Sequence, residues 1–156
     1  MTTHADEAVD RDLRLAVDLL RREGAGFVLV GGGQVVARGD RHGIMPLLDA
    51  VEALRDHGGR ATALADRVLG RAALLLALAV DVQAAHGETA SDAAVLEAQG
   101  RGIALSWSVR VPAILNRAQT DGCPFELALQ GCRDPVEALR VVRSVAAHMR
   151  RSEARG

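Results

Sequence analysis

The sequence lacks lysine and tyrosine altogether, and it has only two phenylalanines and one tryptophan. All 19 of its basic residues are arginines, so an arginine here is weaker evidence for anion binding than it is where lysine is also used. Proteins that bind single-stranded nucleic acid stack the bases on several aromatic side chains. With few aromatic residues and a formal net charge of -1, we expect neither a nucleic acid polymer nor a lipid surface as partner.

The chain also lacks the long apolar segments of secreted and membrane proteins. Residues 1–14 contain no apolar stretch of the kind found in signal peptides. The most apolar run, residues 68–80, is interrupted by Arg71 and is too short to span a bilayer. Only two cysteines occur, Cys123 and Cys132. We therefore expect a cytoplasmic protein with free thiols rather than a disulfide framework.

What the sequence does contain is a regular succession of apolar patterns. Its 156 residues, 49% of them hydrophobic, suit a single domain with a substantial core. Helical spacing, alternation and the positions of glycine and proline predict the elements in order. They are a helix at 6–23, a hairpin of 27–30 against 34–38, a helix at 43–57, a strand at 61–65, a helix at 66–80, a strand at 81–87, a helix at 91–102, a strand at 103–109, a short helix from Pro124 and a last helix at 134–150.

This order predicts an α/β fold. A hairpin followed by strand–helix units indicates a three-layer α/β/α sandwich around a mixed five-stranded sheet. We expect one domain over residues 1–156, in which the N-terminal helix at 6–23 precedes a core at 26–132. The C-terminal helix at 134–150 follows the core, and we expect residues 151–156 to be disordered.

Four segments of the chain look familiar: GIMPLLDAVE at 43–52, ADRVLGRAALLL at 65–76, GIALSWSVRVPAILNR at 102–117 and DGCPFE at 121–126. Together they resemble a small prokaryotic family of unknown function, grouped with the cytidine deaminase-like fold, whose members lack the zinc motifs. The resemblance implies that fold, with a cleft at one end of the sheet where helix N-termini converge.

The zinc motifs of the deaminases are missing at the matching positions. A zinc deaminase needs three nitrogen or sulfur ligands and a glutamate that transfers protons. This sequence has His42-Gly43-Ile44 at the first motif, without that glutamate, and Asp66 stands in the place of the first cysteine. His42, Asp66 and Cys123 could share a metal, but nothing in their spacing requires it. We expect no metal, no cofactor and no deamination by the zinc mechanism.

Cys123 is the first candidate for chemistry. Pro124 suits the first position of a helix and Glu126 suits a capping box. Cys123 is therefore expected at a helix N-terminus, where the helix dipole favours the thiolate, so it would act as nucleophile or acid/base. The alternative is a cysteine that packs as a small hydrophobic residue, which is what we expect of Cys132.

Asp66 is the second catalytic candidate, and the residues after it are candidates for binding. We expect Asp66 at a strand-to-helix junction, where it either caps the helix or orients a ligand in the cleft. Arg67 and Arg71 would lie on one side of that helix with Gly70 between them, either binding an anion at the helix N-terminus or solvating the surface.

Asn116 and Arg117 precede the Cys123 segment and could either line the cleft or fix their own loop. Gly43 belongs to the first matching motif and is expected in the same lining. The ligand-binding candidates are therefore Gly43, Arg67, Gly70, Arg71, Asn116 and Arg117.

These candidates predict a site for a small molecule, nucleotide-like by analogy of fold alone. The chemistry would be thiolate-dependent group transfer or hydrolysis without a metal, with Cys123 and Asp66 as the catalytic residues. The alternatives are a non-catalytic ligand-binding or regulatory module and a redox-responsive protein acting through Cys123. A homodimer is expected from the habits of the fold. His86 is assigned a surface or capping role.

Overall fold

The computed structural model describes residues 3–41, 43–116, 118–119 and 121–155. Its centre is one mixed sheet with the strand order β2-β1-β3-β4-β5. The strands are β1 (Phe27–Gly31), β2 (Gln34–Gly39), β3 (Ala63–Leu69), β4 (Ala84–Ser91) and β5 (Ala104–Val111). β1 is antiparallel to both β2 and β3, whereas β3, β4 and β5 run parallel. The predicted mixed five-stranded sheet is confirmed.

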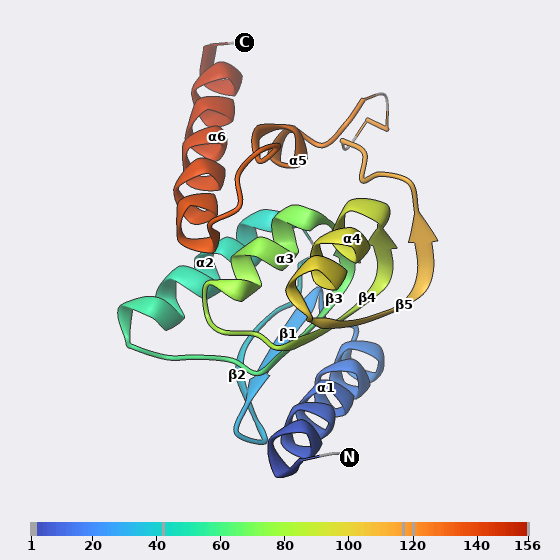
Figure 1. The fold of residues 1–156 in the computed structure, drawn as a ribbon. Coiled ribbons are helices and arrows are strands. Elements are labelled where there is room, and N and C mark those ends of the chain that lie inside the picture. The colour runs from blue at the N-terminus through green and yellow to red at the C-terminus, as the bar shows by residue number, and fades with distance from the viewer. Residues whose placement is uncertain (1–2, 42, 117, 120, 156) are drawn as a thin grey trace.

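Helices cover both faces of this sheet (Figure 1). They are α1 (His4–Glu23), α2 (Ile44–Asp56), α3 (Arg71–Leu78), α4 (Asp92–Arg101), α5 (Pro124–Ala128) and α6 (Pro135–Arg155). α1 lies on one face, and α2, α3 and α4 lie on the other (Figure 1). Two separate buried clusters match these layers, one under α1 and a larger one under the opposite helices. None of the helices in the described part of the chain is long and apolar enough to cross a membrane.

α1 is fixed to the sheet by both apolar and polar contacts. Ala16 and Leu20 form its buried stripe against the sheet. Asp12 is also buried, and its carboxylate accepts a hydrogen bond of 3.0 Å from the backbone amide of Gly33 in the β1–β2 turn. Gly33 has a φ of 79°, a conformation that glycine adopts without steric cost. The helix therefore supports the hairpin turn that the glycine run predicts.

The boundary between β3 and α3 differs from the prediction. The predicted helix at 66–80 begins only at Arg71, because β3 continues to Leu69. β3 is a central strand, in which Asp66 pairs with Phe27 of β1 and with Gly87 of β4. Hydrogen bonds to strands on both sides thus keep Asp66 and Arg67 in extended backbone, although the local pattern is helical. α3 itself is buried on nearly all sides, as its apolar sequence predicts.

Two further predictions need correction. β4 begins at Ala84 and ends at Ser91, whereas the prediction placed this strand at 81–87. The end of the strand is marked by Ser91, whose hydroxyl accepts a hydrogen bond of 3.1 Å from the amide of Ala94 and so caps α4. α6 continues to Arg155, so the prediction of disorder is wrong for residues 151–155. This segment consists largely of good helix formers that extend an existing helix.

Candidate functional site

The candidate site lies where β3 ends and α3 begins, beneath α5 and the loop that follows β5 (Figure 1). Gly70 is the N-cap of α3 and offers no side chain to the free amides of the first turn. The carboxylate of Glu126, on α5, takes that role, because its Oε2 accepts a hydrogen bond of 2.8 Å from the amide of Ala72. α3 is therefore capped by a residue from a distant part of the chain.

The fit between Gly70 and Glu126 leaves no space for a larger residue at position 70. A Cβ atom on Gly70 would lie 1.8 Å from Oε1 of Glu126 and 3.0 Å from Cγ1 of Ile114. Both distances are shorter than van der Waals contact, so a side chain here would force the Glu126 carboxylate and the Ile114 side chain to move. Burial raises the pKa of Glu126, although hydrogen bonds from the amides of Ala72 and Arg71 oppose the rise.

Sequence reasoning missed this role of Glu126. The spacing to Pro124 predicted that Glu126 would belong to the capping of its own helix, but α5 has no side-chain capping hydrogen bond. α5 does begin at Pro124 as predicted, with Cys123 as the N-cap residue. The partner of Glu126 lies 54 positions away, and no local pattern marks a contact of that kind.

Cys123 is half-buried and lies in the same segment as Glu126. Its backbone amide donates a hydrogen bond of 3.1 Å to the carbonyl of Ile114. The side chain of Ile114 in turn reaches the position of Gly70. Ile114 thus connects Cys123 to the start of α3.

Arg71 binds the protein's own groups. Its Nε donates a hydrogen bond of 2.7 Å to Glu97, and one terminal nitrogen donates a bond of 2.7 Å to the carbonyl of Leu129. The other terminal nitrogen bonds the carbonyl of Cys132. These contacts tie the exit of α5 to α3 and α4. Arg71 was predicted to line the ligand site, but its guanidinium already binds these groups of the chain.

Asp66 and Arg67 do not act together. Asp66 lies within β3 and is 5% exposed, so the prediction that it caps α3 is wrong. Burial raises its pKa from 3.8 to about 7, against the hydrogen bonds from the amides of Val68 and Arg67. Arg67 is the next residue of the strand, and adjacent side chains point to opposite faces. Its Nε donates a hydrogen bond of 2.7 Å to the carbonyl of Ala25, so it does not share a helix side with Arg71.

The remaining candidates lie in loops or at helix ends. Gly43 is the N-cap of α2 with a φ of 112°, and no other side chain closely approaches the position of its missing Cβ. The amide of Asn116 donates a hydrogen bond of 2.9 Å to the carbonyl of Asp121, which closes the loop before α5. Arg117 and His42 lie outside the described residues. Within the described ranges, no three His, Cys, Asp or Glu side chains are grouped in a way that could hold a metal ion.

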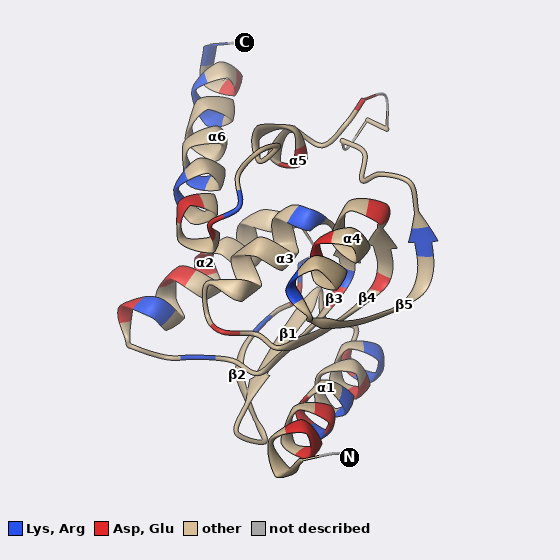
Figure 2. Cartoon of the chain, viewed as in Figure 1, with Lys and Arg blue, Asp and Glu red and all other residues tan. Residues whose placement is uncertain are grey.

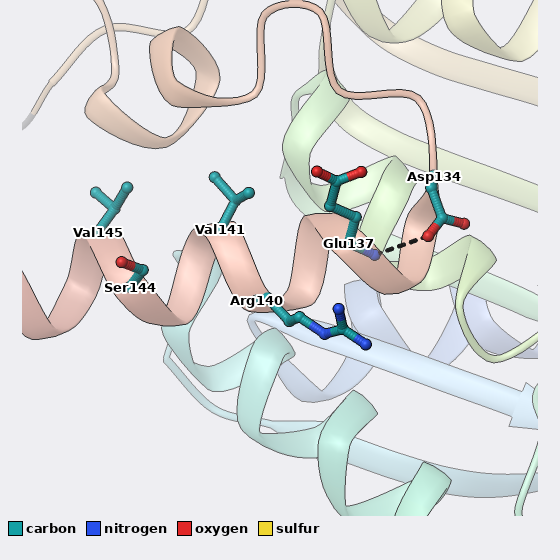
Figure 3. Close-up of a pocket in the computed structure, with 6 residues that line it drawn as sticks. All are labelled: Asp134, Glu137, Arg140, Val141, Ser144 and Val145. Carbon is teal, nitrogen blue, oxygen red and sulfur yellow. Dashed lines mark hydrogen bonds between the residues drawn. The ribbon is translucent and has the colours of Figure 1, made fainter.

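A surface groove runs along α6 (Figure 3). It measures about 480 Å³ and is lined by Asp134, Glu137, Arg140, Val141, Ser144 and Val145. Asp134 accepts a hydrogen bond of 3.1 Å from the amide of Glu137, as a helix N-cap does. The groove is a feature of the surface of α6 and contains none of the predicted site residues.

A second polar cluster lies on the α1 face of the sheet, and sequence reasoning missed it too. His86 is 6% exposed, so its predicted surface or capping role is wrong. It lies in β4 opposite Ser106 of β5, and Glu88 follows on the same face of β4. The alternation of His86 with Glu88 and of Ser106 with Ser108 was the available signal, but only the strand register shows that the two pairs face each other.

Comparison with known proteins finds a family and a solved structure that are similar to this chain. The family described as "Domain of unknown function (DUF1893)", with the label TM1506, matches residues 15–145. Among solved structures, the DUF1893 family protein TM1506 from Thermotoga maritima is 20% identical, with a TM-score of 0.71. The similarity covers 84% of this chain and 87% of that protein, and at this identity it shows a shared fold only. No curated protein matches the chain.

Proposed function

Because the chain belongs to the DUF1893 family, whose description assigns no activity, we propose from the site itself that it binds a small anionic ligand at the N-terminus of α3. The predicted membership of a family of unknown function is confirmed. The cytidine deaminase-like fold and the nucleotide-like character of the ligand remain predictions that rest on analogy of fold.

One observation carries the proposal: the first turn of α3 already binds a carboxylate. Glu126 receives the amide of Ala72 at 2.8 Å. A helix N-terminus supplies free amides and a positive dipole end, which suit the oxygens of a carboxylate or phosphate group. The same amides would serve a ligand, which would replace the Glu126 carboxylate and move α5 away from Gly70.

The raised pKa of Glu126 supports this exchange. Burial raises the pKa of this carboxyl group, so its ionised form is less stable in the site than it is in water. A carboxylate that is held at a cost is easier to displace than one that is stabilised. The proposed ligand would compete with a side chain whose ionised form is disfavoured by burial.

Two roles are compatible with the site, and the contacts favour the non-catalytic one. Arg71 and Glu126 both bind groups of the chain itself, which favours a binding or regulatory module in which α5 moves when ligand binds. The second candidate is thiol-dependent group transfer by Cys123, with Asp66 as the residue that orients the substrate. It is favoured by the position of Cys123 at the start of the segment that carries Glu126.

The test is calorimetric titration of the full chain with inorganic phosphate and with cytidine 5′-monophosphate. Glu126→Ala removes the competing carboxylate, and we expect at least one probe to bind it about tenfold tighter, a difference of about 1.4 kcal/mol. Glu137→Ala, at an exposed position in the first turn of α6, is the matched control and should bind as the unchanged chain does. Equal affinity in all three proteins, or no binding at millimolar concentration, would contradict the proposal.

A further inference from the structure

The second polar cluster forms a continuous hydrogen-bonded chain across β4 and β5. Nδ1 of His86 lies 2.7 Å from the hydroxyl oxygen of Ser106. Nε2 of the same ring lies 3.0 Å from Oε1 of Glu88. A serine, a histidine and a carboxylate in this order are the components that activate a serine hydroxyl as a nucleophile.

The charge state of Glu88 determines the direction of this chain. Burial raises the pKa of Glu88, but hydrogen bonds from Arg21 and His86 outweigh that effect and leave the pKa below its ordinary value. Ionised Glu88 only accepts hydrogen bonds, so the proton of a neutral His86 ring belongs on Nε2. Nδ1 then has a free lone pair and accepts the hydroxyl proton of Ser106.

The cluster opens into a depression between α1 and the outer strands. The depression measures about 400 Å³, and His86 and Ser106 meet side chains of α1 there. Its lining consists of Leu13, Arg14, Val17, Asp18, Arg21, His86 and Ser106. Ser106 is exposed whereas His86 is buried, which is the arrangement needed for a hydroxyl that meets a substrate and a base that is held in place.

The lining also provides charge for recognition. Arg21 is paired with Glu88 at 2.8 Å, and Asp18 is paired with Arg22 at 2.9 Å. Within the described part of the chain, Arg14 has no ion pair or hydrogen bond and is left for a ligand. Leu13 and Val17 add an apolar wall. A small organic acid or its ester, with an apolar part and a negative group, matches this lining.

We infer that Ser106 is a nucleophile activated by His86, and that this depression binds and cleaves small carboxylic esters that carry a second, negatively charged group. The hydroxyl oxygen of Ser106 forms a bond to the ester carbonyl carbon while its proton moves to Nδ1 of His86. The carbon–oxygen bond to the leaving alcohol then breaks, and the alcohol takes that proton.

Water completes the reaction along the same path. It attacks the acyl-serine carbonyl and gives one proton to Nδ1, and the serine oxygen leaves and recovers that proton. The net change is ester and water to acid and alcohol. Arg14 and Arg21 place positive charge beside the depression, which favours the negative charge that develops on the carbonyl oxygen. Glu88 does not touch the substrate and is a positioning residue for His86.

Covalent labelling tests the nucleophile directly. The full chain is treated with an alkyl fluorophosphonate, which reacts with activated serines, and the adduct is located by peptide mass spectrometry. We expect one adduct, on Ser106, absent in Ser106→Ala and formed at least about 100-fold more slowly in His86→Gln. Ser108→Ala is the matched control, because Ser108 lies on the same face and contacts Glu88 and Arg21 but not the histidine.

The outcomes are distinct. If the unchanged chain forms no adduct, or if the adduct lies on another residue, the inference is wrong whatever the variants do. If Ser108→Ala loses the adduct together with Ser106→Ala, the cluster only connects α1 to the sheet. Thermal unfolding of each variant shows that a lost adduct does not reflect a lost fold.

The positioning role of Glu88 has its own readout. His86 is faced by Arg14, Asp18 and Arg21 from α1 and by Glu88 from its own strand. Of these groups, Glu88 is the negatively charged one that is hydrogen-bonded to the ring. Glu88→Gln removes that charge. We therefore expect the pH profile of labelling to shift to lower pH, because the protonated ring loses its stabilising charge. A profile that does not move would remove Glu88 from the relay.

Discussion

Glu126 caps a helix that begins more than fifty residues before it in the chain: its carboxylate accepts the amide of Ala72 at 2.8 Å. The contact joins α5 to the first turn of α3 and places a negative group at the positive end of the helix. It also explains why Gly70 carries no side chain, since a Cβ atom there would overlap the Glu126 carboxylate. Stability and ligand binding are thus connected at one point of the structure.

The first prediction concerns Gly70 and Glu126 as a pair. Gly70→Ala introduces a methyl group 1.8 Å from the Glu126 carboxylate, and we expect it to lower the free energy of unfolding by about 3 kcal/mol. In a Glu126→Ala background the same change should cost clearly less, because only the contact with Ile114 remains. Urea unfolding of the four proteins gives the coupling free energy. Additive costs would show that the two residues do not meet.

Gly100→Ala is the control for that cycle. Gly100 lies within α4, and a Cβ atom there meets nothing within 4 Å. Alanine is the better helix former, so we expect the free energy of unfolding to rise by about 0.5 to 1 kcal/mol. A lower free energy of unfolding in Gly100→Ala would show that alanine destabilises the chain even where no atom lies close. Steric overlap would then not explain the cost of Gly70→Ala.

The second prediction is a pH dependence of stability caused by Asp66. Its pKa rises from 3.8 to about 7 on folding, because burial disfavours the carboxylate. The folded state therefore binds the proton more tightly, and the free energy of unfolding falls as the pH rises from about 4 to 7. Asp66→Asn removes this loss, so we expect it to be more stable than the unchanged chain at pH 8, by up to roughly 4 kcal/mol.

At pH 4 the two proteins should differ little, since Asp66 is then largely protonated in the folded state. Urea unfolding at several pH values between 4 and 8 makes the comparison. Asp10→Asn, at an exposed position of α1, changes the charge by the same amount and should show no such trend. A constant difference between Asp66→Asn and the unchanged chain across this range would contradict the assigned pKa.

The third prediction concerns the contacts by which Arg71 holds the C-terminal end of α5. Arg71→Ala removes its ion pair with Glu97 and its hydrogen bonds to the carbonyls of Leu129 and Cys132. The side chains of Arg71 and Glu97 are only 18% and 15% exposed, so we expect a loss of about 2 to 3 kcal/mol in unfolding free energy. Arg71→Lys should recover only part of it, because lysine cannot form the forked contacts.

A surface ion pair is the comparison for Arg71. Arg22 bonds Asp18 one turn away on α1, and both side chains are largely exposed. We expect Arg22→Ala to leave the free energy of unfolding nearly unchanged, because solvent screens the pair. Hydrogen exchange should in addition show faster exchange around residues 127–132 in Arg71→Ala and no change there in Arg22→Ala. Unchanged exchange in that segment would show that Arg71 does not hold α5.

The fourth prediction follows the movement of α5 through its thiol. Cys123 begins the segment that carries Glu126, whereas Cys132 lies beyond it. If an anionic ligand displaces Glu126, α5 moves, and the alkylation rate of Cys123 by iodoacetamide should change several-fold relative to that of Cys132. The measurement is mass spectrometry of the two peptides with and without phosphate. A constant ratio of the two alkylation rates, at a phosphate concentration that saturates the site, would show that ligand binding does not change the surroundings of Cys123.

Local sequence patterns predicted the elements whose boundaries depend on local interactions. α1 follows from its apolar stripe and Gly24, and the hairpin follows from its glycine turn. For α4 the sequence left Ser91 or Thr89 as the cap and Gly100 or Gly102 as the end, and the structure uses Ser91 and Gly102. Capping and turn residues act within a few positions of themselves. The alternation of strands and helices therefore emerged in the correct order, and with it the mixed sheet.

The misplaced features depend on partners that are distant in the chain. β3 extends through Asp66 because β1 and β4 pair with it, and a local helical pattern does not reveal those partners. The candidate site was affected for the same reason: Glu126 meets Ala72 across 54 positions, and His86 meets Ser106 across 20. Residue type suggested which side chains could react, but the strand register and the path of α5 decide which of them meet.

α1 has a consequence for how the molecule tolerates shortening. It is the only described helix on its face of the sheet (Figure 1), and Figure 2 shows charges of both signs along it. Beneath it, Val28, Val30 and Ala65 have no exposed surface. Removing residues 1–23 would expose this apolar layer to solvent, and the exposed apolar surface would favour self-association. The N-terminal helix that precedes the core in the sequence thus shields one side of the sheet from water.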